Sequence, residues 1–139
     1  MYKKILKKSL LKITPQRSAI LTIIDKYGHT NIETIYKEIK LLFPSISLAT
    51  IYKNINIMKE KGILLELHPM NSKILYEIKK EQHGHFVCKK CNKIFDLKIE
   101  ERNCLKFLYQ KDNDEIFNIE NSEIFLYGIC KKCSYYNDK

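Results

Sequence analysis

The first half of the chain carries its hydrophobic residues at the spacing of amphipathic helices. Residues 2–12 place leucine and isoleucine about one helical turn apart, which predicts a short first helix. Thr14 is a good N-cap, is followed by proline, and starts a second helix that Gly28 can end. A third helix is predicted over residues 31–42, since Pro44 prevents its continuation.

A fourth helix and a hairpin complete this half. Ser47 is the predicted N-cap of a helix that runs to about Lys61, with its apolar residues in one stripe. Residues 63–67 and 73–78 alternate in the manner of strands, and the segment between them is rich in turn residues. Helices followed by a β-hairpin predict a winged helix-turn-helix.

The second half, from about His83, has a different pattern. It combines short strand-like runs with one amphipathic helix, and the expected elements are strands at 86–87, 94–97, 116–119 and 124–129 and a helix at 99–109. We therefore predict an α+β protein. A winged-helix domain would occupy residues 1–80, and a small α/β domain residues 81–139.

Charge divides the chain in the same way. Residues 1–80 hold 15 Lys or Arg and 6 Asp or Glu, a net charge of +9, whereas residues 81–139 hold 10 of each. A basic domain joined to a neutral one favours binding of a polyanion such as a nucleic acid. The alternative is a lysine-rich surface that is only solvated.

Composition limits where the protein works. Hydrophobic residues make up 45% and charged residues 29%, which is typical of a globular protein. No apolar run approaches the roughly 20 residues that cross a bilayer, and the basic N-terminal segment lacks the features of a secretion signal. We expect a cytoplasmic protein that does not bind membranes, so its five cysteines are not expected to form disulfides.

Four of the cysteines form two CxxC pairs. Cys88 and Cys91 make the first pair, and Cys130 and Cys133 make the second after a gap of 38 residues. Two such pairs can surround one tetrahedral Zn(II) at about 2.3 Å from each sulfur, which closes the site to substrate and indicates a structural zinc. A redox-active dithiol or incidental cysteines are the alternatives. Cys104 has no partner motif and is expected to be a small core residue.

A histidine pair precedes the first cysteine. His83 and His85 flank Gly84, and we expect them to point to opposite faces of an extended segment unless the glycine lets both turn toward one ion. Glu77 and Asp96 are nearby in sequence and favour a metal site. Imidazole and carboxylate ligands without thiolate suit Fe(II), Mn(II), Zn(II) or Co(II).

Five motifs together resemble the ferric uptake regulator family. They occur in the family's order from about residue 10 to 133: TPQR at 14–17, a histidine at 29 before a helix, SLATIYKNI at 47–55, HGHFVCKKC at 83–91 and YGICKKC at 127–133. Within that family the chain looks most like the peroxide-responsive repressors, because they typically have aspartate where Asp96 stands. Iron-sensing members typically have glutamate there.

The resemblance implies a regulatory Fe(II) or Mn(II) with three histidine and two carboxylate ligands, which here are His29, Glu77, His83, His85 and Asp96. Some peroxide sensors carry aspartate in place of Glu77. Hydrogen peroxide would be sensed through metal-catalysed oxidation of the ligands His29 and His83, and an iron-responsive repressor is the alternative. An additional metal site of many iron sensors is expected to be absent, because its positions hold Gln82, Gly84, Asn103 and Ser122.

The resemblance also implies a homodimer, formed through the C-terminal domain, that binds an A·T-rich palindromic operator in double-stranded DNA. It assigns DNA binding to Lys12, Arg17, Thr50, Tyr52 and Lys53. Tyr52 could instead be a half-buried core residue, and many members have arginine where Lys53 stands. We expect no enzymatic activity and no small-molecule substrate. A metalloenzyme using the histidine–carboxylate site and a zinc-ribbon interaction module are the competing interpretations.

Overall fold

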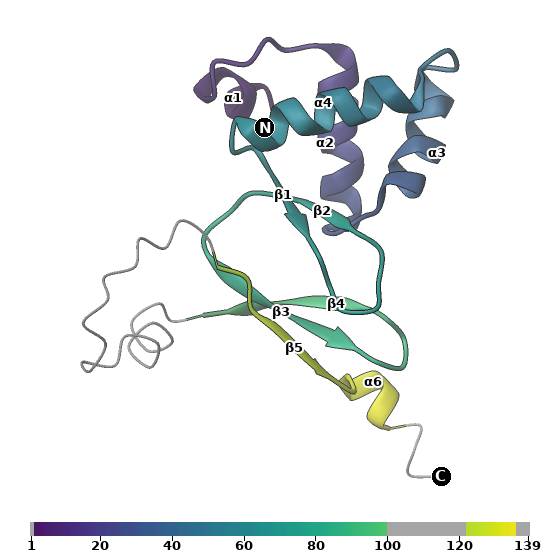
Figure 1. Ribbon diagram of the computed structural model, residues 1–139, viewed down its shortest axis with the longest axis vertical. Helices are drawn as coiled ribbons and strands as arrows, with labels where there is room; N and C mark the ends of the chain where they lie inside the picture. The colour runs from purple at the N-terminus through teal and green to yellow at the C-terminus, as the bar shows by residue number, and fades with distance from the viewer. Residues whose placement is uncertain (1, 100–121, 136–139) are drawn as a thin grey trace, which may run out of the picture. The chain divides into compact units, whose positions relative to one another are not determined.

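The computed structural model describes residues 2–99 and 122–135. Its residues form two compact units, divided between Lys80 and Glu81. Helices and a two-stranded sheet make up the first unit, and a three-stranded sheet dominates the second (Figure 1). This confirms the predicted α+β class. Cys104, the predicted strand at 116–119 and nearly all of the predicted helix at 99–109 lie outside the described residues.

Four helices build most of the first unit: α1 (Tyr2–Lys8), α2 (Pro15–Tyr27), α3 (Ile32–Leu42) and α4 (Leu48–Glu60). The side chains of Thr14, Asn31 and Ser47 each accept a backbone N–H of the first turn of the helix that follows. Thr14 and Ser47 were the predicted N-caps. The longest helices, α2 and α4, have 13 residues each, and within residues 2–99 and 122–135 no helix is long and apolar enough to span a membrane.

Helix α1 ends earlier than the predicted residues 2–12. Leu10 adopts a left-handed φ of 57°, and the N–H of Leu11 returns to the carbonyl oxygen of Leu6 at 3.1 Å. This ends the helix in the way that glycine usually does. The side chain of Leu6 is fully buried, whereas that of Leu10 is 91% exposed.

The core of the first unit is aliphatic, and the two-stranded wing closes it. Strand β1 (Leu64–Leu67) pairs antiparallel with β2 (Leu75–Ile78). An isolated antiparallel bridge joins Thr30, between α2 and α3, to Tyr76 of β2. The fully buried residues of the helices are Leu6, Ile20, Leu21, Ile24, Ile35, Ile39, Ile51, Ile55 and Met58.

The second unit is a sheet with the strand order β4-β3-β5. Strand β3 (His83–Cys88) pairs antiparallel with β4 (Ile94–Lys98) and parallel with β5 (Phe125–Gly128). Strand β3 is longer than the predicted 86–87, because its polar histidines hide the strand pattern in the sequence. A short helix, α6 (Lys131–Ser134), was not predicted, since four residues are too few to show a helical period.

Candidate metal centres and DNA-binding surface

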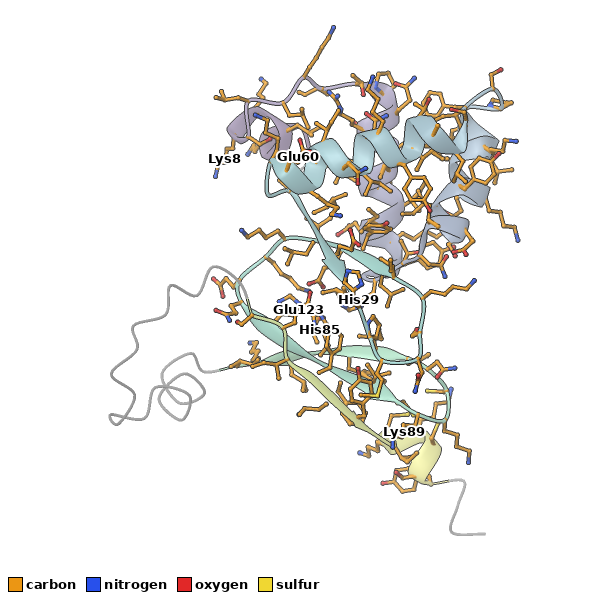
Figure 2. All side chains as sticks on the ribbon, viewed as in Figure 1. Lys8, His29, Glu60, His85, Lys89 and Glu123 are labelled. Carbon is orange, nitrogen blue, oxygen red and sulfur yellow. The ribbon has the colours of Figure 1, made fainter. Side chains whose placement is uncertain are left out.

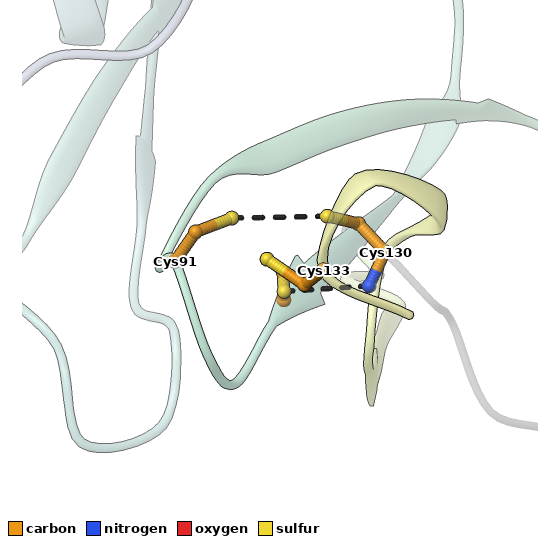
Figure 3. A group of neighbouring side chains, drawn as sticks. Cys91, Cys130 and Cys133 are labelled. Carbon is orange, nitrogen blue, oxygen red and sulfur yellow. Dashed lines mark hydrogen bonds between the residues drawn. The ribbon is translucent and has the colours of Figure 1, made fainter. Parts of the chain in front are cut away.

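The four paired cysteines meet at one end of the three-stranded sheet. Their sulfur atoms lie within 4.8 Å of one another, and the Sγ atoms of Cys91 and Cys130 are 3.8 Å apart (Figure 3). Four sulfurs at about 2.3 Å from a tetrahedral zinc ion are about 3.8 Å apart. The cluster therefore already has the dimensions of a zinc–tetrathiolate.

The turn after β3 shapes the first half of this cluster. The N–H of Asn92 donates to the carbonyl oxygen of Cys88 at 2.9 Å, and Asn92 adopts a left-handed φ of 58°, which asparagine tolerates well. Lys89, labelled in Figure 2, follows Cys88 in this turn. The backbone N–H of Lys89 donates to the carbonyl oxygen of Gly128, in β5, at 2.8 Å. The second pair follows β5, so the β3–β5 pairing brings both turns together.

The pKa values of two of the cysteine thiols are shifted in opposite directions. Hydrogen bonds from backbone N–H groups, that of Cys130 foremost, lower the pKa of Cys88 to about 6. Burial and hydrogen bonds with the other cysteines raise the pKa of Cys133 to about 12. At neutral pH Cys88 is thus a ready thiolate ligand, whereas Cys133 must lose a proton before it binds a metal.

Strand pairing gathers a second set of ligands in the second unit. His85 lies on β3 (Figure 2), directly opposite Asp96 of β4, and His83 is two residues before it on the same strand. The two histidine Nε2 atoms are 3.0 Å apart, and Asp96 Oδ1 lies 3.5 Å from His83 Nε2 and 3.7 Å from His85 Nε2. Phe125 of β5 stacks on the His85 ring with 5.4 Å between centroids, which fixes the ring plane.

The expectation that His83 and His85 point to opposite faces was wrong. Residues i and i+2 of a strand share a face, so both imidazoles point the same way without any help from Gly84. Gly84 has another role. A Cβ there would lie 2.8 Å from Ile99 Cδ1 and 3.5 Å from the carbonyl oxygen of Ile124, so the glycine makes room for packing on the opposite face.

A histidine–carboxylate pair forms in the first unit. Glu77 of β2 is only 1% exposed, and its Oε2 lies 3.0 Å from His29 Nε2. The bridge between Thr30 and Tyr76 produces this contact, because His29 and Glu77 are the next residues along the two bridged segments. A carboxylate so far from water requires a positive partner, and a divalent cation supplies one.

The donor chemistry of both sets fits a divalent transition metal. Each set consists of imidazole nitrogen and carboxylate oxygen with no thiolate, which suits Fe(II) or Mn(II) and differs from the sulfur cluster. The two His83 and His85 nitrogens at 3.0 Å cannot both donate to each other, whereas both can serve as ligands of one ion.

Many iron-sensing members of the family have an additional metal site, and two of its positions in this chain are joined by a hydrogen bond. Gln82 Nε2 donates to Ser122 Oγ at 2.7 Å, and Gly84 offers no side-chain ligand. Asn103 lies outside the described residues. The absence of that site stays a prediction.

The residues assigned to DNA gather around α4 and the segment before α2. Thr50, Tyr52 and Lys53 are exposed on α4, and Lys12 is exposed just before the N-cap of α2. Tyr52 is 39% exposed, and it is neither a buried core residue nor one of the hydrophobic residues packed against the core. The pKa of Tyr76, on β2, is raised by its burial.

Arg17, also assigned to DNA, makes two hydrogen bonds within the protein. Its Nε donates to Asn54 Oδ1 at 3.1 Å, and its Nη1 donates to the carbonyl oxygen of Lys12 at 2.7 Å. Asn54 was not predicted from the sequence, and no local pattern could identify it, because 37 positions separate it from Arg17.

The chain is similar in sequence to proteins named peroxide-responsive repressors. The peroxide-responsive repressor PerR of Staphylococcus epidermidis is 35% identical over 129 residues, which cover 92% of this chain and 85% of the relative. The PerR of Staphylococcus aureus is also 35% identical, and the match covers 92% of this chain and 86% of that protein.

Solved structures share the fold over nearly the whole chain. The peroxide stress regulator of Campylobacter jejuni is 37% identical with a TM-score of 0.70, and the match covers 96% of both chains. The ferric uptake regulator of Vibrio cholerae is 26% identical with a TM-score of 0.68, covering 94% of this chain and all of that one. The resemblance found in the sequence is confirmed: the Ferric uptake regulator family model matches residues 8–127, and the chain belongs to this family.

Proposed function

We propose that this protein is a metal-dependent transcriptional repressor that binds DNA as a homodimer and responds to hydrogen peroxide. The observation that carries the proposal is the donor chemistry of the two ligand sets, His29 with Glu77 and His83 and His85 with Asp96. Relatives at 35–37% identity are peroxide regulators, which supports peroxide as the signal.

In this proposal a single Fe(II) or Mn(II) ion is bound by both sets at once. Two ligands belong to the winged-helix domain, residues 1–80, and three to the dimerisation domain, residues 81–139. A ligand set divided in this way gives the ion a higher affinity for one relative orientation of the domains than for others. Differential affinity is what lets a ligand shift a conformational equilibrium, so the ion would favour the DNA-binding orientation.

Peroxide would end repression by damaging the ligands. Fe(II) held by these residues would supply the redox chemistry that activates hydrogen peroxide. In the balanced overall reaction, one peroxide oxygen is added to a ligand imidazole, which loses two electrons, and the other oxygen leaves as water. His29 and His83 are the proposed targets. An oxidised imidazole is a poorer ligand, so the ion would be lost and the domains would be released from the DNA-binding orientation.

DNA recognition is proposed for the basic first unit. Helix α4 would enter the major groove, with Tyr52 against thymine methyl groups and Thr50 and Lys53 beside it. Lys12 would approach the minor groove, which is narrow and electronegative in A·T tracts. Dimerisation through the second domain would set two α4 helices at the spacing of a palindromic operator.

The four-cysteine cluster is proposed to hold a structural Zn(II). A full shell of four thiolates leaves no open position for a substrate or for peroxide, so its role would be to stabilise the dimerisation domain. We further propose that the protein acts in the cytoplasm and is not an enzyme, since members of its family are transcription regulators.

An iron-responsive repressor is the second candidate. Family membership supports it, as does the 26% identity with the Vibrio cholerae ferric uptake regulator. The Vibrio cholerae protein is less similar in sequence to this chain than the peroxide regulators are. In addition, the resemblance associates aspartate at position 96 with the peroxide sensors. The two candidates differ in what peroxide does to the iron-loaded protein.

The decisive experiment measures operator binding with metal-free, Mn(II)-loaded and Fe(II)-loaded protein, before and after hydrogen peroxide. A duplex selected by the Mn(II) protein from a random library serves as the probe. We expect both metals to promote binding, and peroxide to abolish binding only in the Fe(II) sample. Peptide mapping should find one added oxygen on His29 or His83.

Substitution of both His83 and His85 by alanine provides the matched control. This variant should keep its zinc and lose metal-dependent DNA binding. Unchanged binding would favour the zinc-ribbon interaction module, and an Fe(II) complex that survives peroxide without histidine oxidation would favour the iron-responsive repressor. Saturable turnover of a small substrate would support the metalloenzyme.

A further inference from the structure

Arg17 makes hydrogen bonds to two segments of the chain. In the proposed function, these two segments bind in different grooves of DNA. Its Nη1 donates to the carbonyl oxygen of Lys12 at 2.7 Å, in the segment before α2. Its Nε donates to Asn54 Oδ1 at 3.1 Å, on α4. The side chain is only partly exposed, and both acceptors are neutral oxygens. The guanidinium therefore fixes geometry at these contacts and does not compensate a carboxylate.

The link continues from Asn54 into the N-terminal half of α4. Asn54 Nδ2 donates to the carbonyl oxygen of Thr50 at 3.0 Å, one helical turn earlier. Because the amide oxygen accepts from Arg17 while the amide nitrogen donates to Thr50, only one orientation of the Asn54 side chain makes both bonds. Ser47 caps the same turn by accepting the Thr50 N–H at 3.1 Å.

The other end of the link is equally fixed. Thr14 Oγ1 accepts the backbone N–H of Arg17 at 3.3 Å, so the N-cap of α2 sets the position from which the Arg17 side chain starts. Lys12 lies two residues before that cap. A continuous set of hydrogen bonds thus runs from the backbone of Lys12 through Arg17 and Asn54 to the backbone of Thr50.

We propose that Arg17 is a positioning residue, which holds the Lys12 segment at a fixed distance from α4 so that both grooves can be engaged together. The proposal rests on the DNA-binding function proposed above and specifies how the two contact segments are aligned. This positioning role differs from a direct contact with DNA phosphate, in which Arg17 would contribute through its positive charge. Only an arginine fork can donate from two separate nitrogens in a fixed plane, and lysine cannot replace it.

DNA affinity at several salt concentrations separates the two roles. The probe is the duplex selected from a random library by the native Mn(II)-loaded protein. We expect Arg17→Lys and Asn54→Ala each to lower the affinity by about tenfold, and the double variant to be no weaker than the worse single variant. The slope of log affinity against log salt should match that of the native protein, because no phosphate contact is lost.

Lys53→Gln is the reference for a lost charge contact and should reduce the salt slope by about one. If Arg17→Lys binds within about twofold of the native protein, or if Arg17→Gln reduces the slope as Lys53→Gln does, Arg17 contacts phosphate and the positioning role is wrong.

A measurement without DNA tests the link itself. In urea unfolding, the effects of Arg17→Gln and Asn54→Ala should be strongly non-additive, whereas those of Arg17→Gln and Asn56→Ala, an exposed asparagine of the same helix, should add. Additive effects for the first pair would overturn the proposal even if DNA binding is normal. A native chain that selects no duplex while the first pair remains non-additive would instead count against the proposed function.

Discussion

Thr30 and Tyr76 exchange two backbone hydrogen bonds, at 3.2 Å from the Thr30 N–H and at 2.8 Å from the Tyr76 N–H. This single bridge ties the loop before α3 to strand β2. It also places His29 Nε2 within 3.0 Å of Glu77 Oε2, on the two neighbouring residues. Backbone pairing within the first unit therefore builds this part of the proposed regulatory site.

Glu77→Gln tests the role of the buried carboxylate. The amide has nearly the same volume, but it lacks the negative charge that binds a cation. We expect the affinity for Mn(II), measured by calorimetry, to fall by at least about tenfold. The metal-free variant should resist urea about as well as the native protein, because the amide keeps an oxygen that can accept a hydrogen bond from His29 and a buried neutral amide costs less than a buried charge.

Glu66→Gln is the matched control for this experiment. Glu66 is a wing carboxylate on β1 that pairs with Lys59, and its loss should leave Mn(II) affinity unchanged. Equal Mn(II) affinity in the Glu77→Gln variant and the native protein would remove Glu77 from the regulatory site.

Leu10→Gly should stabilise the protein. Leu10 has a left-handed φ of 57° and a side chain that is 91% exposed, so the substitution relieves backbone strain and loses almost no packing. The expected gain is about 1 kcal/mol in the free energy of unfolding, measured in urea. Leu11→Gly, one residue later, should destabilise, because Leu11 packs against the core. A Leu10→Gly variant no more stable than the native protein would show that the strain is absent.

The helices of the first unit were predictable because their signals are local. Thr14 and Ser47 cap the helices that follow them. Pro44 comes directly after the C-cap residue of α3 and prevents the helix from continuing. The early end of α1 was not predictable, since it depends on a leucine in a conformation that normally indicates glycine. Elements whose ends depend on strain or on long-range packing leave no such signal.

The candidate sites were predictable to the extent that spacing or resemblance identifies ligands. Two CxxC pairs specify a zinc cluster from spacing alone, whereas His29 entered only through the family resemblance. The expectation that His83 and His85 point to opposite faces was wrong, because residues two apart on strand β3 share a face without any help from Gly84. The contact between Arg17 and Asn54 joins distant residues, and sequence periodicity does not report such contacts.

Zinc affinity should increase with pH. The pKa of Cys133 is about 12, so at neutral pH zinc must displace its proton, and each displaced proton makes the affinity rise about tenfold per pH unit. Cys88, with a pKa of about 6, is already a thiolate above that pH and adds to the dependence only below it. Competition with a chelator between about pH 6.5 and about pH 8 measures the slope. A pH-independent affinity would contradict the assignment of Cys133 as a protonated ligand.

Gly84→Ala distinguishes packing from backbone freedom at the histidine pair. Its new methyl group would meet Ile99 Cδ1 at 2.8 Å. Because this atom is the end of a flexible, partly buried side chain, we expect a loss of at most about 1 kcal/mol in the free energy of unfolding. Ile99→Val removes that carbon, so adding Gly84→Ala to it should cost almost nothing further. Mn(II) affinity of the double variant should equal that of Ile99→Val alone, because the histidines occupy the other face of β3. If Gly84→Ala weakens Mn(II) binding equally with and without Ile99→Val, the metal site itself needs the glycine, and the packing explanation fails.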